Sequence, residues 1–349
     1  MINEARSWPE SVGSEEELED LLTRPGAALV QAIGKVSSPL LVLGAGGKMG
    51  PTLAALARRA AEAAGHPLEV IAASRFADGR ARDWLEQRGI RTISCDFLDH
   101  SAVEKLPEAA NIIYLAGLKF GTANDPASTW AMNVVAPTRV AERYPNARIV
   151  ALSTGNVYPQ SPVAKGGSLE TDALTPLGEY ANSAVGRERV FEYFSRRNGT
   201  QVAMMRLFYA VELRYGVVVD IAQKILAGEP IDVATGHFNC VWQGDANEII
   251  LRALDLAASP MTVWNLCRPE VFSVRAVAMR LGKLIGREPK FVGTEAANAL
   301  LGNAEPICAK LGRPPVELEA ILPLVARWVV RGGRTLGKPT HFEARDGKY

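Results

Sequence analysis

Cysteine is scarce in this chain of 349 residues, which has four, scattered along its length. No two of them have the CxxC spacing of a zinc site, and no disulfide framework is indicated, so we expect reduced, buried thiols and no metal. An excess of charge of one sign is also absent, because 39 lysines and arginines stand against 38 aspartates and glutamates. Nucleic acid and anionic membrane surfaces are therefore not expected as partners.

Long hydrophobic runs are absent as well. The apolar runs, such as residues 40–43 and 149–152, are far too short to span a bilayer. Residues 1–20 are acidic and polar, unlike a signal peptide. We expect a cytoplasmic protein that acts on a small molecule and contacts neither membrane nor nucleic acid. A homodimer is compatible with this composition.

A glycine-rich turn is the most informative feature that is present. Gly44, Gly47 and Gly50 are spaced three apart, between an apolar run at 40–43 and an alanine-rich stretch at 51–64. A strand, a glycine turn and a helix in this order direct backbone N–H groups and a helix N-terminus at an anion, and the glycines keep side chains out of its way. The pattern predicts a site for the pyrophosphate of a dinucleotide, with Lys48 and Met49 beside it.

Short apolar runs alternate with helix-like stretches from residue 40 to residue 208. Such runs are typical of strands whose sheet is covered by helices on both faces, so we expect an α/β fold with a doubly wound parallel sheet of the Rossmann type. The expected strands are residues 40–43, 69–73, 91–94, 112–115, 149–152 and 202–207.

The organisation along the chain follows from this alternation. We expect a helical extension at 1–38, broken near residues 24–26, and the dinucleotide-binding domain at 39–208. A smaller, mixed α/β substrate lobe at 209–330, interleaved with the core, precedes a loosely held tail at 331–349. Within the lobe we expect helices at 217–228, 245–257, 274–285 and 317–330, and a strand at 262–266.

The second and third expected strands end in residues suited to the adenosine half of a dinucleotide. Ser74 and Arg75 offer a hydroxyl and a guanidinium where an acidic residue would repel a 2′-phosphate, so NADP is favoured over NAD. If Arg75 is simply solvated in a loop, it contacts no 2′-phosphate, and NAD remains an alternative cofactor. Asp96 can accept from the adenine amino group while Phe97 covers the ring, although an ordinary Asp-rich loop would look the same.

The next two strands lead toward the reacting end. Leu115, Ala116 and Gly117 allow the backbone to pass close to a ligand, and Lys119 can donate to a ribose hydroxyl. Thr154 follows the fifth strand, and Tyr180 begins a later helix. A hydroxyl and a tyrosine placed in this way can share one substrate oxygen, with the tyrosine as acid or base during hydride transfer. Alone, such a tyrosine is more often a packing residue.

In order and spacing, residues 40–330 resemble the extended short-chain dehydrogenase/reductase family, the NAD(P)-dependent sugar epimerases and dehydratases. The segments that carry the resemblance are residues 44–50, 95–99, 115–119, 133–134, 153–158 and 180–188. The resemblance implies that Thr154 and Tyr180 are catalytic and that Lys119 contacts the nicotinamide ribose. We also place Asn133 and Phe208 among the cofactor contacts and Asn156 among the substrate contacts.

The chain departs from the family at several places, among them residues 206–211, which replace an Asn-x-Tyr-Gly-Pro-like stretch. Ala184 replaces the lysine of the YxxxK motif, which in the family holds the nicotinamide ribose and lowers the pKa of the tyrosine. Lys119 or Arg187 are candidate replacements, but Arg187 lies two helical turns from Tyr180 and is a poor surrogate at that distance. The acidic pair of dehydratases is replaced by Gly155-Asn156, which disfavours a dehydratase.

A further departure concerns the substrate. In the family, one segment of the lobe often supplies an arginine that binds the diphosphate of a nucleotide sugar. The corresponding residues 237–245 contain no arginine, which argues against a nucleotide-sugar substrate. His237, Asn239, Trp242 and Gln243 are candidates for recognising a smaller polyhydroxylated or carboxylated molecule. Packing at the junction of core and lobe is an equally good interpretation of these four residues.

The sequence thus leads to one main hypothesis and two alternatives. The main hypothesis is an NAD(P)-dependent oxidoreductase or epimerase acting on a hydroxyl or ketone of a sugar-like or sugar-acid substrate. The first alternative is a catalytically silent dinucleotide-binding regulator or scaffold, which Ala184 would permit. The second is a non-redox isomerase or lyase on the same fold.

Overall fold

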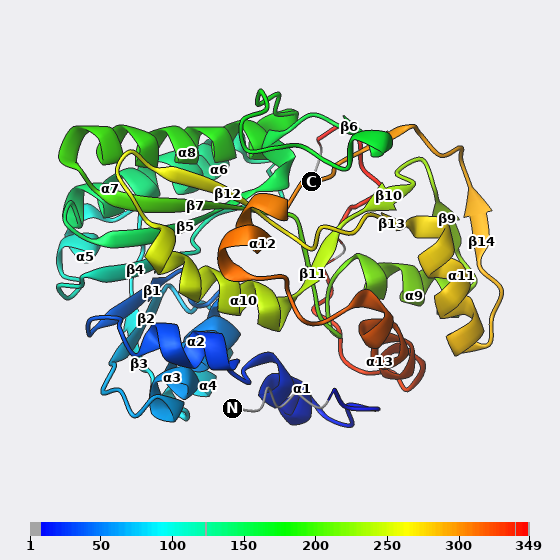
Figure 1. The fold of residues 1–349 in the computed structure, drawn as a ribbon, viewed down its shortest axis with the longest axis horizontal. Coiled ribbons are helices and arrows are strands. Elements are labelled where there is room, and N and C mark those ends of the chain that lie inside the picture. The colour runs from blue at the N-terminus through cyan, green and yellow to red at the C-terminus, as the bar shows by residue number, and fades with distance from the viewer. Residues whose placement is uncertain (1–7, 123, 339, 348–349) are drawn as a thin grey trace.

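A seven-stranded parallel sheet forms the centre of the protein (Figure 1). A computed structural model describes residues 8–122, 124–338 and 340–347. The strand order is β12-β7-β5-β4-β1-β2-β3, so the expected doubly wound sheet is confirmed. The strands are β1 (Leu40–Leu43), β2 (Val70–Ser74), β3 (Arg91–Ser94), β4 (Asn111–Tyr114), β5 (Arg148–Thr154), β7 (Gln201–Leu207) and β12 (Thr262–Leu266).

Helices cover both faces of this sheet, because successive side chains of each buried strand point to opposite sides. In β1, Val42 packs toward one face and Leu41 toward the other. The first face carries α2 (Ala27–Ile33), α3 (Gly50–Ala63), α4 (Arg80–Glu86) and α10 (Gln243–Arg252). The second carries α5 (His100–Glu104), α6 (Pro126–Trp130), α7 (Ala136–Arg143) and α8 (Gly178–Asn198).

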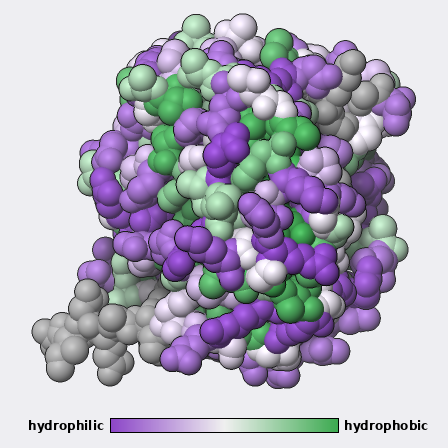
Figure 2. Space-filling view, turned by 90° about the vertical axis from the view of Figure 1, so that its right-hand side faces the viewer, coloured by the Kyte–Doolittle hydropathy of each residue, from purple (hydrophilic) through white to green (hydrophobic). Residues whose placement is uncertain are grey.

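A smaller lobe lies beside the sheet, on the right in Figure 1. Three amphipathic helices share one apolar core there: α9 (Val217–Ala227), α11 (Val274–Ile285) and α13 (Leu318–Val330). Short strand pairs surround them: β8 (Tyr209–Val211) with β11 (Cys240–Trp242), β9 (Pro230–Asp232) with β14 (Lys290–Val292), β10 (His237–Phe238) with β13 (Phe272–Ser273), and β6 (Ser161–Pro162) with β15 (Asn298–Ala299). Figure 2 shows mostly hydrophilic side chains on the outer face of this lobe, with hydrophobic ones in separate groups.

The lobe is interleaved with the core. The strand expected at 262–266 is β12, which extends the central sheet by pairing with β7 and so does not belong to the lobe. The helix expected at 245–257 is α10 followed by a short 3₁₀ turn, and α10 packs on α3 of the core. Another short helix, α12 (Glu305–Leu311), contacts β12.

The N-terminal extension links the two halves. Its helix α1 (Glu15–Leu22) begins at Ser14, whose side chain accepts from the Glu17 N–H, and its leucines join the lobe core. After the break at residues 24–26, α2 joins the core beneath the sheet. The extension is therefore a structural bridge between sheet and lobe.

The C-terminal tail differs from the expectation of a loosely held segment. Thr340 donates from its N–H and its hydroxyl to the Asp220 carboxylate on α9, at 2.8 and 2.5 Å. Phe342 is 3% exposed and packs in the lobe core. The described tail is held in place because it buries an aromatic side chain and donates hydrogen bonds to a carboxylate. Its Gly-, Lys- and Arg-rich composition does not indicate these contacts.

Within the described residues, no helix is long and apolar enough to cross a membrane. No group of three or more His, Cys, Asp or Glu side chains in that part of the chain is arranged to hold a metal ion. All four cysteines are free and buried.

Candidate active site

The three glycines of the β1–α3 turn have different structural roles. Gly44 has φ +86°, and a Cβ there would lie 2.5 Å from the Ala116 nitrogen. A Cβ at Gly50 would lie 2.5 Å from the Ala45 Cα. Both glycines are thus required by the close approach of backbone segments. A Cβ at exposed Gly47 would meet only the Gly44 carbonyl, at 3.2 Å, so this side of the turn is open.

The open turn fits a dinucleotide. The N-terminus of the 14-residue helix α3 faces it, and backbone amides at a helix N-terminus bind phosphate. Ser74, at the end of β2, lies against Gly46 of the turn, and the neighbouring Arg75 is exposed. Asp96 is exposed and accepts from the Leu98 N–H at 3.0 Å, while Phe97 is buried.

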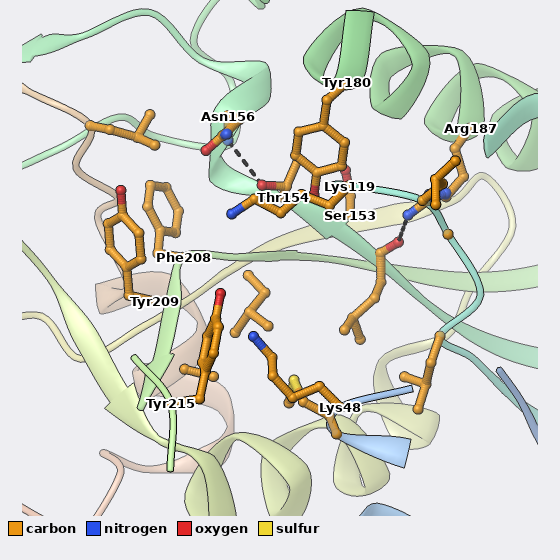
Figure 3. A pocket seen from close by; sticks show the side chains of 18 residues that line it. Lys48, Lys119, Ser153, Thr154, Asn156, Tyr180, Arg187, Phe208, Tyr209 and Tyr215 are labelled. Atoms are coloured by element: carbon orange, nitrogen blue, oxygen red, sulfur yellow. Dashed lines mark hydrogen bonds between the residues drawn. The ribbon is translucent and has the colours of Figure 1, made fainter. Parts of the chain in front are cut away.

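A pocket of about 190 Å³ continues from the turn along the carboxyl ends of the strands toward the lobe (Figure 3). It contains many of the residues expected from the sequence: Lys48, Met49, Leu115, Gly117, Lys119, Thr154, Asn156, Tyr180 and Phe208. The lining also includes Leu118, Leu152, Ser153, Arg187, Leu207, Tyr209, Ala210, Tyr215 and Leu300.

Thr154 and Tyr180 meet in this pocket. The neighbouring Ser153 hydroxyl is already committed, since it donates to Glu188 at 2.6 Å. Thr154 ends β5, and its hydroxyl accepts from the Asn156 N–H at 3.2 Å. Burial raises the pKa of Tyr180, while the Arg187 charge and a hydrogen bond with Thr154 oppose that rise. Thr154 and Tyr180 are thus the hydroxyl pair that the pocket presents.

Arg187 brings a positive charge near Tyr180. Its guanidinium donates to the Leu152 carbonyl at 2.9 Å and to the Asn133 side chain at 2.5 Å. It lies so close to Gly117 that a Cβ there would collide with it. The side chain can reach because helical side chains lean toward the N-terminus of their helix. Sequence spacing alone underestimated this reach.

Asn133 has a supporting position. It is fully buried, accepts from the Leu118 N–H at 2.9 Å and donates to the Leu118 carbonyl at 3.0 Å. Its Nδ2 also donates to Ser183 at 2.9 Å. Asn133 is not among the residues that line the pocket, and its hydrogen bonds hold the 117–119 loop and Arg187. A contact of Asn133 with the cofactor stays a prediction.

Two lysines enter the pocket. The Lys48 ammonium lies 2.8 Å from the centroid of the Tyr215 ring (Figure 3). Burial, together with the charge of Lys119, lowers its pKa to about 6. Lys119 has its ammonium 5.9 Å from the centroid of the Tyr180 ring, and burial lowers its pKa to about 8. Both lysines are half-buried on the pocket wall, and burial disfavours the charged form of each.

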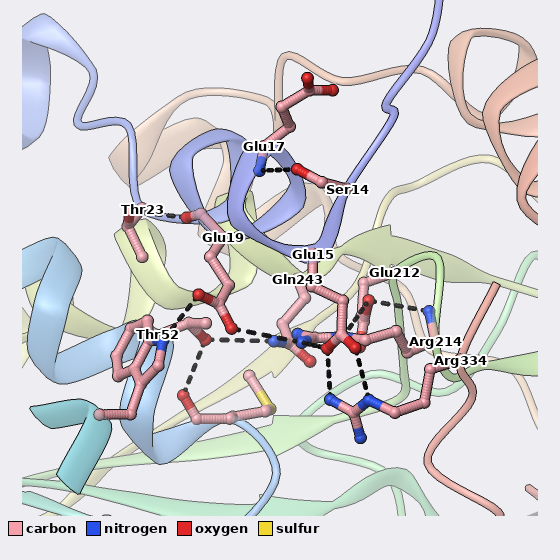
Figure 4. Close-up of polar contacts among 12 residues, drawn as sticks. Ser14, Glu15, Glu17, Glu19, Thr23, Thr52, Glu212, Arg214, Gln243 and Arg334 are labelled. Atoms are coloured by element: carbon pink, nitrogen blue, oxygen red, sulfur yellow. Dashed lines mark hydrogen bonds and ion pairs between the residues drawn. The ribbon is translucent and has the colours of Figure 1, made fainter.

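The loop that carries Tyr215 is fixed by an ion-pair network (Figure 4). Arg214 donates to Glu212 at 3.1 Å and to Glu15 of α1 at 3.2 Å. Arg334, from the tail, also donates to Glu15, at 2.6 Å. The N-terminal extension and the tail therefore hold one wall of the pocket from behind.

The four substrate residues expected at 237–243 are not in the pocket lining. Asn239 exchanges hydrogen bonds with Gly302, both at 3.0 Å, and Gln243 donates to Thr52 at 3.2 Å. Trp242 packs edge-on against Trp8, and His237 pairs with Ser273 between β10 and β13. These contacts favour the packing interpretation for this segment, because they join separate parts of the protein.

The sequence interpretation missed Tyr209 and Tyr215, which face the lobe side of the pocket. A usable signal was the Tyr215-Gly216 pair directly before α9, since Gly216 has φ 126° and such a value marks a turn that needs glycine.

Comparisons with known proteins agree with this geometry. The family model described as NAD dependent epimerase/dehydratase family matches residues 40–267. The structure of UDP-glucose 4-epimerase from Thermotoga maritima with UDP-glucose has a TM-score of 0.68 and 19% identity, covering 84% of this chain and 99% of that chain. UDP-glucose 4-epimerase from Thermus thermophilus, in complex with NAD, has a TM-score of 0.67 and 21% identity, covering 84% of this chain and 99% of that chain.

UDP-glucuronic acid 4-epimerase from Bacillus cereus in complex with NAD has a TM-score of 0.69 and 16% identity, covering 84% of this chain and 98% of that chain. No curated protein matches this chain in sequence. At these identities, likeness to the solved structures shows a shared fold.

Proposed function

Because the chain belongs to the NAD-dependent epimerase/dehydratase family, we propose that it is an NAD(P)-dependent oxidoreductase or epimerase acting on a sugar-like or sugar-acid substrate. The reacting group is a hydroxyl or a ketone. The observation that carries the proposal is the meeting of Thr154, Tyr180 and the Arg187 charge in one pocket beside the open glycine turn.

The residues around the turn would hold the cofactor. The amides near Gly47 and Lys48 would bind the pyrophosphate, Ser74 and Arg75 would face the adenosine ribose, and Lys119 would face the nicotinamide ribose. When bound, the dinucleotide would supply a hydride acceptor or donor.

The protein's own part in the reaction is proton transfer and orientation. Tyr180 takes the proton from a substrate hydroxyl, or returns it to a ketone, through its phenolic oxygen. The Thr154 hydroxyl orients the same substrate oxygen. Arg187 stabilises the phenolate, since a nearby cation favours the charged form of tyrosine.

The substrate is proposed to be smaller than a nucleotide sugar. The described tail, red in Figure 1, runs along the boundary between sheet and lobe. Its His341 ring lies 6.5 Å from that of Phe120, and a Cβ at Gly178 would collide with Gly347. Phe120 and Gly178 adjoin Lys119 and Tyr180, so the tail crosses near the mouth of the pocket. A cavity of about 190 Å³ is also below the range of roughly 300–1,000 Å³ found for drug-sized ligands.

The first prediction tests the reaction. The wild-type protein, given NAD or NADP and a panel of hexoses, hexuronates and their lactones or ketones, should change nicotinamide absorbance or interconvert two epimers. Tyr180→Phe should lower kcat by roughly 100-fold or more, because general acid–base catalysis contributes 10²–10⁴-fold. Tyr193→Phe, on the exposed face of the same helix, is the matched control and should retain full activity. Turnover that survives Tyr180→Phe would refute the mechanism.

A second prediction concerns the choice between NADP and NAD. If Arg75 binds the 2′-phosphate, Arg75→Ala should weaken NADP binding by about 1.5–3 kcal/mol and leave NAD binding nearly unchanged. Calorimetric titration with both dinucleotides measures this difference. Equal weakening of both, or a wild-type preference for NAD, would contradict the assignment.

A further inference from the structure

The pocket is lined by cations without acidic residues. Its lining includes Lys48, Lys119 and Arg187 and, among the described residues, no aspartate or glutamate. Arg187 is engaged by the Asn133 side chain and the Leu152 carbonyl. The side chains of Lys48 and Lys119 also line the cavity (Figure 3).

Two carboxylates, Glu212 and Asp220, act on Lys48 through their charges, but both have other partners. Glu212 accepts from the Arg214 N–H at 2.9 Å and from the Arg214 side chain at 3.1 Å. Asp220 accepts from the Thr340 N–H and hydroxyl. Neither forms an ion pair with Lys48 in the described part of the chain. Lys48 has instead the face of the Tyr215 ring, a weaker partner for a cation than a carboxylate.

The direction of the Lys48 side chain separates it from the pyrophosphate site. Its backbone lies in the glycine turn, but its ammonium reaches Tyr215, in the loop between β8 and α9 of the lobe. Tyr209 and Phe208 line the same side of the cavity. This is the side opposite the turn, where a substrate would lie beside the nicotinamide.

Resting on the proposed function, we propose that Lys48 is the receptor for an anionic group of the substrate, a carboxylate or a phosphate. Tyr215 holds the Lys48 ammonium in place until that group binds. The substrate is therefore a negatively charged, sugar-sized molecule, and its neutral analogue is a poor ligand. Burial lowers the pKa of Lys48. An anionic group bound beside the ammonium raises that pKa again, because a nearby opposite charge favours the charged form.

The test compares charged and neutral probes of matched shape. The NAD-saturated protein is titrated with glucuronate against its methyl ester, and with glucose 6-phosphate against glucose. We expect at least one anion to bind roughly ten- to a hundredfold more tightly than its neutral partner, as for a charge-assisted hydrogen bond. The two pairs distinguish a carboxylate from a phosphate.

Variants of Lys48 decide whether this residue is responsible. Lys48→Met should bring the ratio between charged and neutral probes close to one, and Lys48→Arg should retain most of it. Lys105→Met, at the exposed end of α5, is the control and should leave the ratio unchanged. No preference for anions in the wild type, or a preference that survives Lys48→Met, overturns the proposal. So does a Lys48→Met variant in which NAD binding weakens and the ratio persists, because Lys48 would then serve the pyrophosphate.

The readout is binding, so it is independent of turnover. If the protein binds anions through Lys48 but transfers no hydride, the proposed function is refuted and the anion receptor is not. A protein that turns over neutral sugars without preferring anions would refute the receptor alone.

Discussion

Single residues at the glycine turn have separable roles. Gly44 and Gly50 are needed by the protein's own packing, because any Cβ there would meet backbone atoms at 2.5 Å. Gly47 has no such constraint and has no positive φ. The spacing of three glycines predicted the site, and the structure shows which of them the protein's own packing requires.

A third prediction follows from this difference. Gly47→Val should fold normally and lose more than roughly tenfold in dinucleotide affinity, because its side chain would occupy the open side of the turn. Gly50→Ala should instead lower the free energy of unfolding by about 1–3 kcal/mol, as overpacking does. Circular dichroism, thermal unfolding and calorimetric titration separate the two effects. Unchanged affinity in a folded Gly47→Val protein would remove the cofactor assignment.

Arg187 is the second residue whose role depends on tertiary placement. Its cation favours the phenolate of Tyr180, while burial raises the pKa of that tyrosine. The phenolate must form for Tyr180 to accept a proton, so activity in the oxidative direction should rise with pH as the phenol ionises. Removing the cation would raise the pKa of Tyr180 and move this rise to higher pH.

The fourth prediction uses this sign. Arg187→Leu should shift the rising limb of the kcat/KM profile toward alkaline pH by about one unit or more, since a nearby opposite charge moves a pKa by that amount. Arg187→Lys, which keeps the charge, should shift it less. Measured profiles that coincide for the wild type and Arg187→Leu would show that Arg187 has a structural role alone.

Restoring the family lysine is informative in the same series. Ala184 is fully buried on the same helix face as Arg187, three residues away. A lysine there would face the Arg187 guanidinium, and like charges repel. Ala184→Lys should therefore increase the rate in the Arg187→Leu background and fail to increase it in the wild type.

Among the elements, the tail shows how composition can mislead. Besides Thr340 and Phe342, it contributes Arg345, which donates to the Ala234 carbonyl at 3.2 Å and the Asn298 carbonyl at 3.1 Å. Glu343 pairs with Lys224 of α9. One buried ring and a few hydrogen bonds are enough to hold the segment beside the mouth of the pocket.

The fifth prediction belongs to this element. Phe342→Ala should release the tail, because a buried phenylalanine contributes about 3–5 kcal/mol, more than the polar contacts of a terminal segment can replace. Hydrogen exchange should become faster at the Thr340 and Phe342 amides, while amides of the central strands keep their protection. Lys338→Ala, an exposed change in the same segment, is the control. Unchanged exchange in Phe342→Ala would mean that Phe342 does not anchor the tail.

At the scale of the whole molecule, the pocket lies where sheet and lobe meet. The carboxyl ends of the parallel strands supply Thr154, and the glycine turn after β1 supplies Lys48. The lobe supplies Tyr215 through a loop that α1 and Arg334 support from behind. Segments from both ends of the chain thus hold one binding site.

Local patterns in the sequence determined the strands, most helices and the positions of Gly47, Thr154 and Tyr180. These features depend on neighbours in the chain, such as an apolar run followed by glycines or a hydroxyl at a strand end, so they can be read without a fold. β12 is an instructive case, because its bounds were predicted but its place in the central sheet was not. Pairing with β7 is a contact between distant segments.

Tertiary structure alone decided which polar groups face the pocket and which join the protein's parts. Asn239, Trp242 and Gln243 look like ligand-binding residues in sequence and are used in packing, whereas Tyr215 shows little in sequence and lines the cavity. The Arg187 charge acts on Tyr180 because a long side chain can reach back along its helix, and Lys48 points across the pocket to the lobe. The direction of a side chain depends on what packs around it, and the local sequence does not contain that information.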